Sequence, residues 1–319
     1  MMYLLLIVGF VLLVKGADVF VDGSSSVAKN LRVPSIIIGL TVVAFGTSCP
    51  EAAVSVTASL NGQNAISFSN VVGSNIFNLM VVTGLSAILS PVKTDKDLLK
   101  RDFPISILAA AALIVLTLVI GDGSMLSRVD GVILLIFFGV FLWLMIRTAL
   151  TNRSSAAEED EYKVMPMWKS FLFIILGITG IIIGGQLVVD SATDIALALG
   201  MSETLVGLTI VSIGTSLPEL VTSIVAAKKG EADIALGNVV GSNIFNILLI
   251  LGLASAISPM TVEMESIYDT VILIAMSFLV FLPLLKTKKV NRSMGIIMVV
   301  VYAIYMAYII AREYGMLML

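Results

Sequence analysis

The sequence contains two copies of one long segment, and this repeat constrains the fold more than any other feature. Residues 39–60 read GLTVVAFGTSCPEAAVSVTASL, and residues 207–228 read GLTIVSIGTSLPELVTSIVAAK, an offset of 168 positions (207 − 39 = 168). The same offset places SNVVGSNIFN, at residues 69–78, on GNVVGSNIFN, at residues 237–246, without a gap. A repeat of this length indicates that the two halves of the chain fold as similar units.

Both copies lie within long apolar blocks that are separated by Gly, Pro, Asn and charged residues. Hydrophobic residues make up 58% of the 319 residues and charged residues only 13%, whereas soluble domains average about 45–50% and about 25%. A bilayer core about 30 Å thick requires roughly 20 apolar residues in each helix. The chain is therefore predicted to be an all-α polytopic membrane protein. We expect about ten transmembrane helices, at residues 3–27, 34–59, 69–89, 103–121, 129–150, 168–192, 203–226, 237–257, 266–286 and 293–312.

The basic residues lie almost entirely on one side of these predicted spans. Of the 19 Lys and Arg residues, 16 fall in the loops after the first, third, fifth, seventh and ninth spans. Only Arg128 and Arg312 fall on the opposite side, and Lys15 lies within the first span. Because loops rich in Lys and Arg remain in the cytoplasm, we expect both termini to be extracellular, in a multi-pass protein of the plasma membrane.

The number of spans determines how the two copies are related. Each copy holds about five spans, an odd number, so the second copy must cross the membrane in the opposite sense. We therefore predict two inverted five-helix repeats, residues 1–150 and 168–319, joined by a cytoplasmic linker at residues 151–167. The linker contains AAEEDE, a run that is typical of a solvated segment. Secondary transporters with inverted repeats bind their substrate at the bilayer midplane, between the repeats.

Each repeat carries a proline in the middle of an apolar span, within G-T-S-C-P-E (residues 46–51) and G-T-S-L-P-E (residues 214–219). Pro50 and Pro218 cannot donate a backbone hydrogen bond, and each ring clashes with the carbonyl four residues back. Both helices should therefore break, which frees carbonyl oxygens inside the bilayer. Irregular backbone persists at this depth only where it is buried or lines a cavity, and a bound cation would satisfy these oxygens.

A glutamate follows each proline, Glu51 in the first repeat and Glu219 in the second. A charge near the bilayer centre costs at least about 2.5–3.5 kcal/mol, so such residues usually mark ion pathways. The alternative is a kinked helix whose glutamate pairs with a basic residue. Lys15 is the one basic residue predicted within a span, and it could neutralise only one of the two. Hydroxyl oxygens lie one turn away, at Thr47, Ser48, Thr215 and Ser216.

The second motif, G-S-N-I-F-N, occurs at residues 73–78 and 241–246. Its Ser and second Asn are four positions apart and share one face of a helix. Small and amide residues also join membrane helices to one another, but the repeat beside a broken helix favours ligands. The candidate ligands are Ser74, Asn78, Ser242 and Asn246. The remaining pair, Asn75 and Asn243, points elsewhere on the helix and is expected to be structural.

The candidate ligands are all oxygen atoms, which selects a hard cation. The chain has no histidine, and its single cysteine, Cys49, aligns with Leu217 in the other repeat, so we expect this cysteine to pack rather than bind. A flexible set of oxygen ligands suits Ca²⁺, which takes about six to eight of them. Two glutamates balance one Ca²⁺. Once it leaves, two bare carboxylates would be costly, so monovalent cations or protons should replace it, as in an exchanger.

The paired motifs resemble the α-repeats of the cation/calcium antiporter superfamily, and the chain is similar to prokaryotic sodium/calcium exchangers over nearly its whole length. The resemblance implies ten helices, alternating access and electrogenic exchange of about three Na⁺ for one Ca²⁺. It also implies that the first and sixth helices slide past the core as a gate. It implies lipid and the two ions as partners, with no cofactor, nucleic acid or obligatory protein partner.

The resemblance also implies a role for each site residue. Glu51 and Glu219 would supply the calcium carboxylates, and the carbonyls of Thr47 and Thr215 would complete that site. Sodium would be bound through the backbone of Ala44 and Ser212 and through Ser48, Ser216, Ser74 and Ser242, with Asn78 and Asn246 lining the middle. Some relatives, including potassium-dependent ones, carry Asp where this chain has Asn246, which argues against potassium co-transport and leaves the coupling ratio open.

Other functions remain open from the residues alone. Exchange of Ca²⁺ for H⁺ is the runner-up, because two clustered glutamates could also carry protons. A cation channel would present similar oxygen ligands, although an inverted pair of broken helices favours alternating access. An intramembrane hydrolase would need a nucleophile–base pair or an aspartyl dyad, and neither stands out in the sequence. We therefore predict a transporter and not an enzyme.

Overall fold

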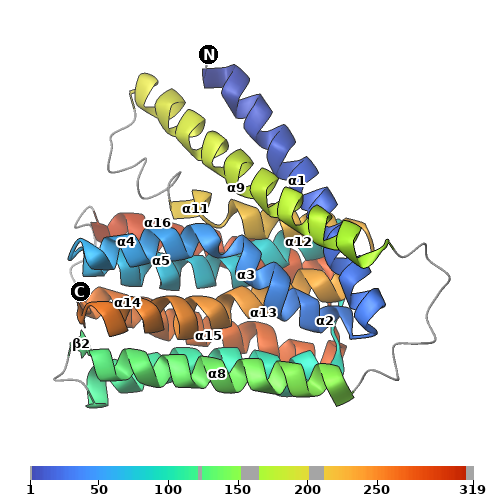
Figure 1. Cartoon of the computed structure of the whole chain (residues 1–319). Coiled ribbons are helices and arrows are strands. Elements are labelled where there is room, and N and C mark those ends of the chain that lie inside the picture. Colours follow the sequence, from blue (N-terminus) through green and yellow to red (C-terminus); the bar gives the residue numbers. More distant parts are fainter. Residues whose placement is uncertain (1, 121–123, 152–164, 201–211, 314–319) are drawn as a thin grey trace.

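The structure is a computed structural model that describes residues 2–120, 124–151, 165–200 and 212–313 (Figure 1). Apart from four two-residue strands, the regular elements are helical, and several helices contain π-helical turns, labelled η. The first half comprises α1 (Met2–Leu31), α2 (Ser35–Ile38), η1 (Gly39–Val43), α3 (Ala44–Thr47), α4 (Cys49–Leu60), α5 (Asn64–Phe77), η2 (Asn78–Val82), α6 (Thr83–Leu89), β1 (Val92–Lys93), η3 (Leu98–Asp102), α7 (Phe103–Val115), η4 (Leu116–Ile120), β2 (Met125–Leu126) and α8 (Arg128–Thr151).

The described elements of the second half are a similar series of helices with two further short strands. It comprises α9 (Met167–Ala198), α11 (Ser212–Gly214), α12 (Leu217–Lys228), α13 (Ala232–Phe245), η7 (Asn246–Leu251), α14 (Gly252–Ile257), β3 (Met260–Thr261), α15 (Met264–Thr287), β4 (Lys289–Val290) and α16 (Arg292–Glu313). β1 pairs with β4 and β2 pairs with β3, both antiparallel, so each short ribbon joins the two halves. Among the described residues, these strands depart from the all-helical prediction.

The described residues contain eight helices that are long and apolar enough to cross a membrane. A ninth span is formed if residues 35–47 and 49–60 are counted together, since they are bent by 51° at a short break. The predicted span at residues 203–226 begins outside the described residues. Most of the predicted linker also lies outside them. The chain is thus a helical membrane protein, while the count of ten remains a prediction.

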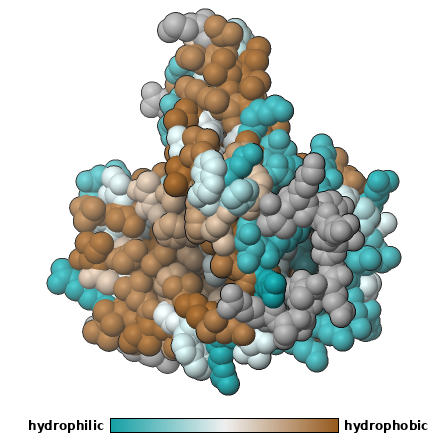
Figure 2. Space-filling view, turned by 45° about the vertical axis from the view of Figure 1, so that its right-hand side comes forward, coloured by the Kyte–Doolittle hydropathy of each residue, from teal (hydrophilic) through white to brown (hydrophobic). Residues whose placement is uncertain are grey.

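Two helices cross the outside of the bundle, and two lie at its centre. α1 and α9 pack along each other and project beyond the other helices, which run roughly parallel (Figure 1). Apolar side chains cover the projecting part, as Figure 2 shows, in agreement with contact with lipid. The spans at residues 64–89 and 232–257 are the most buried, with 83% and 78% of their apolar stretch inside the protein. These two spans carry the G-S-N-I-F-N motifs.

The repeat is visible in the local structure. α4 and α12 each have 12 residues, and α5 and α13 each have 14. A glycine with positive φ follows both α4 and α12, with φ of 74° at Gly62 and 80° at Gly230. Glycine adopts this conformation at little cost. The π-helical turns after α5 and α13 begin at Asn78 and Asn246. Such turns are frequent at functional sites, and sequence analysis did not anticipate them.

Candidate cation site

The two G-T-S-x-P-E segments form broken helices, as their prolines require. The chain leaves the helical conformation at Ser48, between α3 and α4, and at residues 215–216, between α11 and α12. Pro50 and Pro218 lie in the first turn of α4 and α12. Proline is well tolerated there because its missing N–H would have no intrahelical partner.

Glu51 and Glu219 lie in the same first turns, and both are fully buried, with 0% exposure. Ser216 Oγ donates a hydrogen bond to Glu51 Oε1 over 3.0 Å, and Ser48 Oγ donates one to Glu219 Oε1 over 3.0 Å. Each glutamate therefore contacts the broken helix of the other repeat. The exchange of equivalent contacts is what a two-fold pseudo-symmetry axis between the repeats produces.

The central helices contribute the next groups. A hydrogen bond of 3.1 Å joins Ser216 Oγ to Ser74 Oγ, and Ser242 Oγ donates to Glu219 Oε1 over 3.4 Å. Asn75 Nδ2 donates to the carbonyl of Asn243 over 3.1 Å, and the reverse bond spans 3.2 Å. This reciprocal pair clamps α5 to α13, which fits the structural role expected for these two asparagines.

The site contains several buried oxygens that have no hydrogen-bond partner. They are Glu51 Oε2, Glu219 Oε2, Asn78 Oδ1, Asn246 Oδ1 and Thr215 Oγ1. Buried polar atoms in proteins are nearly always paired, so a cluster of acceptor oxygens without donors has the chemistry of a cation site. In the part of the chain that the structure describes, no three Asp, Glu, His or Cys side chains converge. The candidate site therefore combines two carboxylates with neutral oxygens.

The remaining predicted ligands lie at the two breaks. Ala44 and Thr47 are fully buried in α3. Ser212 begins α11, and its side chain is outside the described residues. None of the ion pairs among the described residues includes Glu51 or Glu219. Lys15 is exposed. The structure therefore does not support the alternative in which one of the two glutamates forms a structural ion pair with Lys15.

Sequence analysis overlooked one polar pair beside the site. Asn238 is fully buried, accepts a hydrogen bond from Thr47 Oγ1 over 2.9 Å and donates one to Ser223 Oγ over 2.9 Å. Its repeat partner Asn70 donates to Ser55 Oγ over 2.9 Å. The signal was available, because both copies carry Asn four positions before the motif serine.

Glycines allow α1 and α9 to lie in close contact. A Cβ added at Gly16 would lie 2.7 Å from the backbone nitrogen of Ile181, and one at Gly184 would lie 2.5 Å from that of Leu13. Glycine allows two helix backbones to approach closely inside a membrane.

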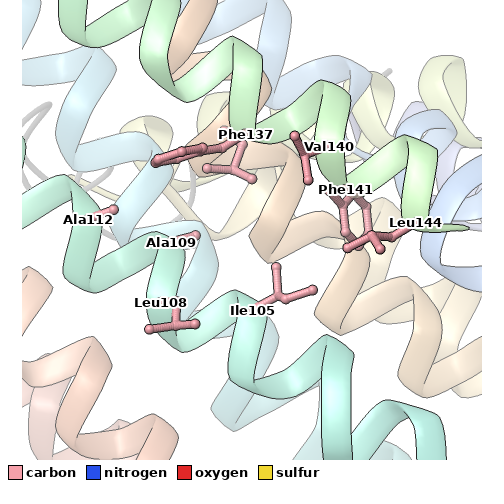
Figure 3. Close-up of a pocket in the computed structure, with 9 residues that line it drawn as sticks. Ile105, Leu108, Ala109, Ala112, Phe137, Val140, Phe141 and Leu144 are labelled. Atoms are coloured by element: carbon pink, nitrogen blue, oxygen red, sulfur yellow. The ribbon is translucent and has the colours of Figure 1, made fainter.

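A separate pocket lies between α7 and α8, with Leu248 of η7 among its lining residues (Figure 3). The other lining residues are all apolar: Ile105, Leu108, Ala109, Ala112, Phe137, Val140, Phe141 and Leu144. The exposed side chains of Leu108 and Phe137 place it on the lipid-facing surface of the bundle. It offers no side-chain oxygen to a cation.

Comparison with known proteins agrees with this geometry. The family model for sodium/calcium exchanger proteins matches residues 1–147 and 169–311. The sodium/calcium exchanger MaX1 of Methanosarcina acetivorans is 35% identical over 339 residues, which cover 95% of this chain and 97% of that protein. The putative antiporter CaxA of Alkalimonas amylolytica is 39% identical over 308 residues, covering 94% and 95%.

A solved structure shares the fold. The sodium-calcium exchanger NCX_Mj, soaked with 2.5 mM Na⁺ and 1 mM Sr²⁺, matches with a TM-score of 0.82 and 37% identity, over 96% of this chain and 97% of the other. These relatives are transporters. The match of fold, family model and full-length relatives leads to one conclusion: the chain is a multi-span membrane transporter, not an enzyme, and belongs to the sodium/calcium exchanger family.

Proposed function

We propose that this protein is a secondary antiporter that exchanges Na⁺ for Ca²⁺ by alternating access. The observation that carries the proposal is a pair of fully buried glutamates, one from each repeat, each with an oxygen that lacks a hydrogen-bond donor. The relatives support it, since one is named a sodium/calcium exchanger and NCX_Mj was solved with Na⁺ and Sr²⁺.

In this proposal, Ca²⁺ binds between Glu51 and Glu219, and the carbonyls of Thr47 and Thr215 complete its shell. Sodium ions bind to the serine hydroxyls and to backbone carbonyls, and Asn78 lines the middle with its repeat partner. The sodium ligands are Ser48, Ser74, Ser216 and Ser242, with the carbonyls of Ala44 and Ser212. An all-oxygen set with two carboxylates fits hard cations.

The buried carboxylates also explain why the ions should exchange. Two like charges that share a dry site repel each other and are poorly solvated, so the site should cross the membrane only when cations neutralise it. Two glutamates balance one Ca²⁺. Three Na⁺ at the same site would carry one additional positive charge, so about three Na⁺ per Ca²⁺ makes each cycle electrogenic.

The membrane arrangement is part of the proposal. The excess of Lys and Arg places the loops after α1, α8 and α12 in the cytoplasm and both termini outside the plasma membrane. Residues 1–150 and 168–319 would then form the two inverted repeats, joined by the linker at residues 151–167. The alternative function is exchange of Ca²⁺ for H⁺, which the closeness of two buried carboxylates favours, because such pairs bind protons readily.

The test is uptake of ⁴⁵Ca into proteoliposomes loaded with Na⁺ and diluted into sodium-free buffer. We expect uptake to require the outward sodium gradient. Uptake should increase when the vesicle interior is made positive, because three Na⁺ leaving for one Ca²⁺ entering moves one net positive charge outward. Potassium gradients should have no effect. Calcium uptake that ignores the sodium gradient but follows a pH step would replace this proposal with proton exchange.

A further inference from the structure

The two repeats contact the α1–α9 pair differently, although their sequences align. We call residues 229–231, which follow α12, the latch loop. Lys229 Nζ lies 2.8 Å from Asp18 Oδ1 and 2.6 Å from Asp22 Oδ1. Glu231 Oε1 also lies 3.5 Å from Nζ of Lys29 in α1, so three ion pairs join this loop to α1. Ser25 of α1 donates a hydrogen bond to the carboxylate of Glu231. One end of the core is thus held against α1.

The equivalent positions at the other end make no such contact. Asn61 takes the place of Lys229, and Gln63 takes that of Glu231; both are exposed. On α9, Gln186 takes the place of Asp18, and its amide donates within the same helix to Asp190 over 2.8 Å. Among the described residues, no hydrogen bond or ion pair joins α9 to residues 61–63. Figure 1 shows the C-terminal end of α9 standing away from α4.

The same asymmetry occurs inside the core. Thr47 Oγ1 donates to Asn238 Oδ1, and Asn238 is fully buried. The equivalent hydroxyl, Thr215 Oγ1, has no hydrogen-bond partner, and the equivalent amide, Asn70, is partly exposed. Asn238 and Asn70 hold equivalent positions, each the seventh of the 14 residues in α13 and α5. The loop contact and this hydrogen bond are therefore two sets of contacts whose repeat equivalents are not made.

We propose that Lys229, Asp18 and Asp22 form an ion-pair latch that holds the cytoplasmic side closed and biases the transporter toward its outward-facing state. The proposal rests on the alternating access of the proposed function. When α1 and α9 move to close the other side, symmetry brings α9 to residues 61–63. That contact has no cation to match the role of Lys229, so the two states are not equally stabilised.

The size of the bias follows from exposure. The side chain of Lys229 is 27% exposed, and those of Asp18 and Asp22 are 44% and 49% exposed. Ion pairs this accessible to water contribute up to about 1 kcal/mol, which corresponds to about fivefold in a population ratio. Salt screens such pairs, so high ionic strength should weaken the latch.

The test measures the opening between α9 and residue 63 in the full-length protein in lipid nanodiscs. Spin labels are attached at Asp194→Cys and Gln63→Cys, which are exposed positions, in a Cys49→Leu background. Asp194 and Gln63 are the repeat equivalents of Ser26 and Glu231, which lie at the closed end. The distance distribution then reports the outward-facing population as long distances and the inward-facing population as short ones.

Lys229→Asn, which installs the residue of the other repeat, should raise the ratio of short to long distances about fivefold. Lys228→Asn is the matched control, with the same charge change one position away, and it should leave the ratio unchanged. Choline chloride at high concentration should shift the distance distribution of the protein with Lys229 in place. It should not shift that of Lys229→Asn. The charge swap Asp22→Lys with Lys229→Asp should restore part of the original distribution.

Equal distance distributions for Lys229→Asn and Lys228→Asn would overturn the latch. This result would leave the exchange function untouched, because sodium-driven ⁴⁵Ca uptake is measured separately. If the protein fails the uptake assay but shows the expected shift in distances, the latch is supported and the proposed exchange of Na⁺ for Ca²⁺ is rejected. Thermal unfolding of both asparagine variants verifies that each one is folded.

Discussion

Replacing Glu51 with Gln tests the cation site most directly, because it removes one charge and keeps the shape of the side chain. Glu51 is fully buried, its Oε1 accepts a hydrogen bond from Ser216, and its Oε2 has no donor. In the absence of ions, the second carboxylate, Glu219, lies in the same buried site. The substitution therefore removes a buried charge that only a cation would stabilise.

The two expected effects have opposite signs. Loss of one partner of a buried charge pair costs about 3–5 kcal/mol, so Ca²⁺ affinity should fall by at least about 10²-fold. At a Ca²⁺ concentration 100 times the Kd, binding stabilises the native protein by about 2.7 kcal/mol, whereas a site weakened 10²-fold gains only about 0.4 kcal/mol. Without ions, the variant should be at least as stable as the wild type, because the repulsion between carboxylates is gone.

The assay is thermal unfolding in detergent with and without Ca²⁺, combined with ⁴⁵Ca uptake. Wild type should show a Ca²⁺-dependent rise of several degrees in the unfolding midpoint, and Glu51→Gln should lose the rise together with uptake. Glu265→Gln is the control, since Glu265 is exposed at the start of α15. A Glu51→Gln protein that is stabilised by Ca²⁺ as wild type is would refute the assignment of the site.

Two further substitutions test the supporting structure. Asn238→Leu should lower the stability of the protein by at least about 2 kcal/mol, because several buried partners lose their hydrogen bonds; Asn70→Leu should cost less, since Asn70 is partly exposed. Thermal unfolding compares the two variants. Equal losses of stability would contradict the difference in burial between Asn238 and Asn70. Gly184→Ala should slow exchange several-fold, because the added Cβ would lie 2.5 Å from Leu13 N, while Gly139→Ala, with open space around it, should not. Normal flux in Gly184→Ala would argue against close packing of α1 on α9.

Much of the architecture was predictable because its causes are local. Uncharged blocks of about 20 residues have few alternatives to a membrane helix, and the proline in each G-T-S-x-P-E segment breaks its helix wherever the chain goes. The candidate ligands were predictable for a second reason: carboxylates in apolar segments stand out against their surroundings. The repeat also aligns Glu51 with Glu219 by position alone.

Other features depended on contacts between distant segments. The short strands arise where loops of the two halves meet, as when Val92 pairs with Val290, and no local pattern signals such a pairing. The hydrogen bond from Thr47 to Asn238 joins residues 191 positions apart. Asn238 looked like an ordinary motif residue in the sequence, and only its burial against the broken helix gave it a role.

The sequence by itself determined a duplicated membrane transporter with one glutamate in each G-T-S-x-P-E segment, because hydropathy, proline geometry and repetition are all properties of neighbouring residues. It did not determine which end of the core is closed. The motifs match at both ends, whereas the folded chain joins Lys229 to α1 and leaves its repeat equivalent, Asn61, exposed. The tertiary structure decided this point, since a single arrangement of α1 and α9 cannot pack closely against both ends of the core at once.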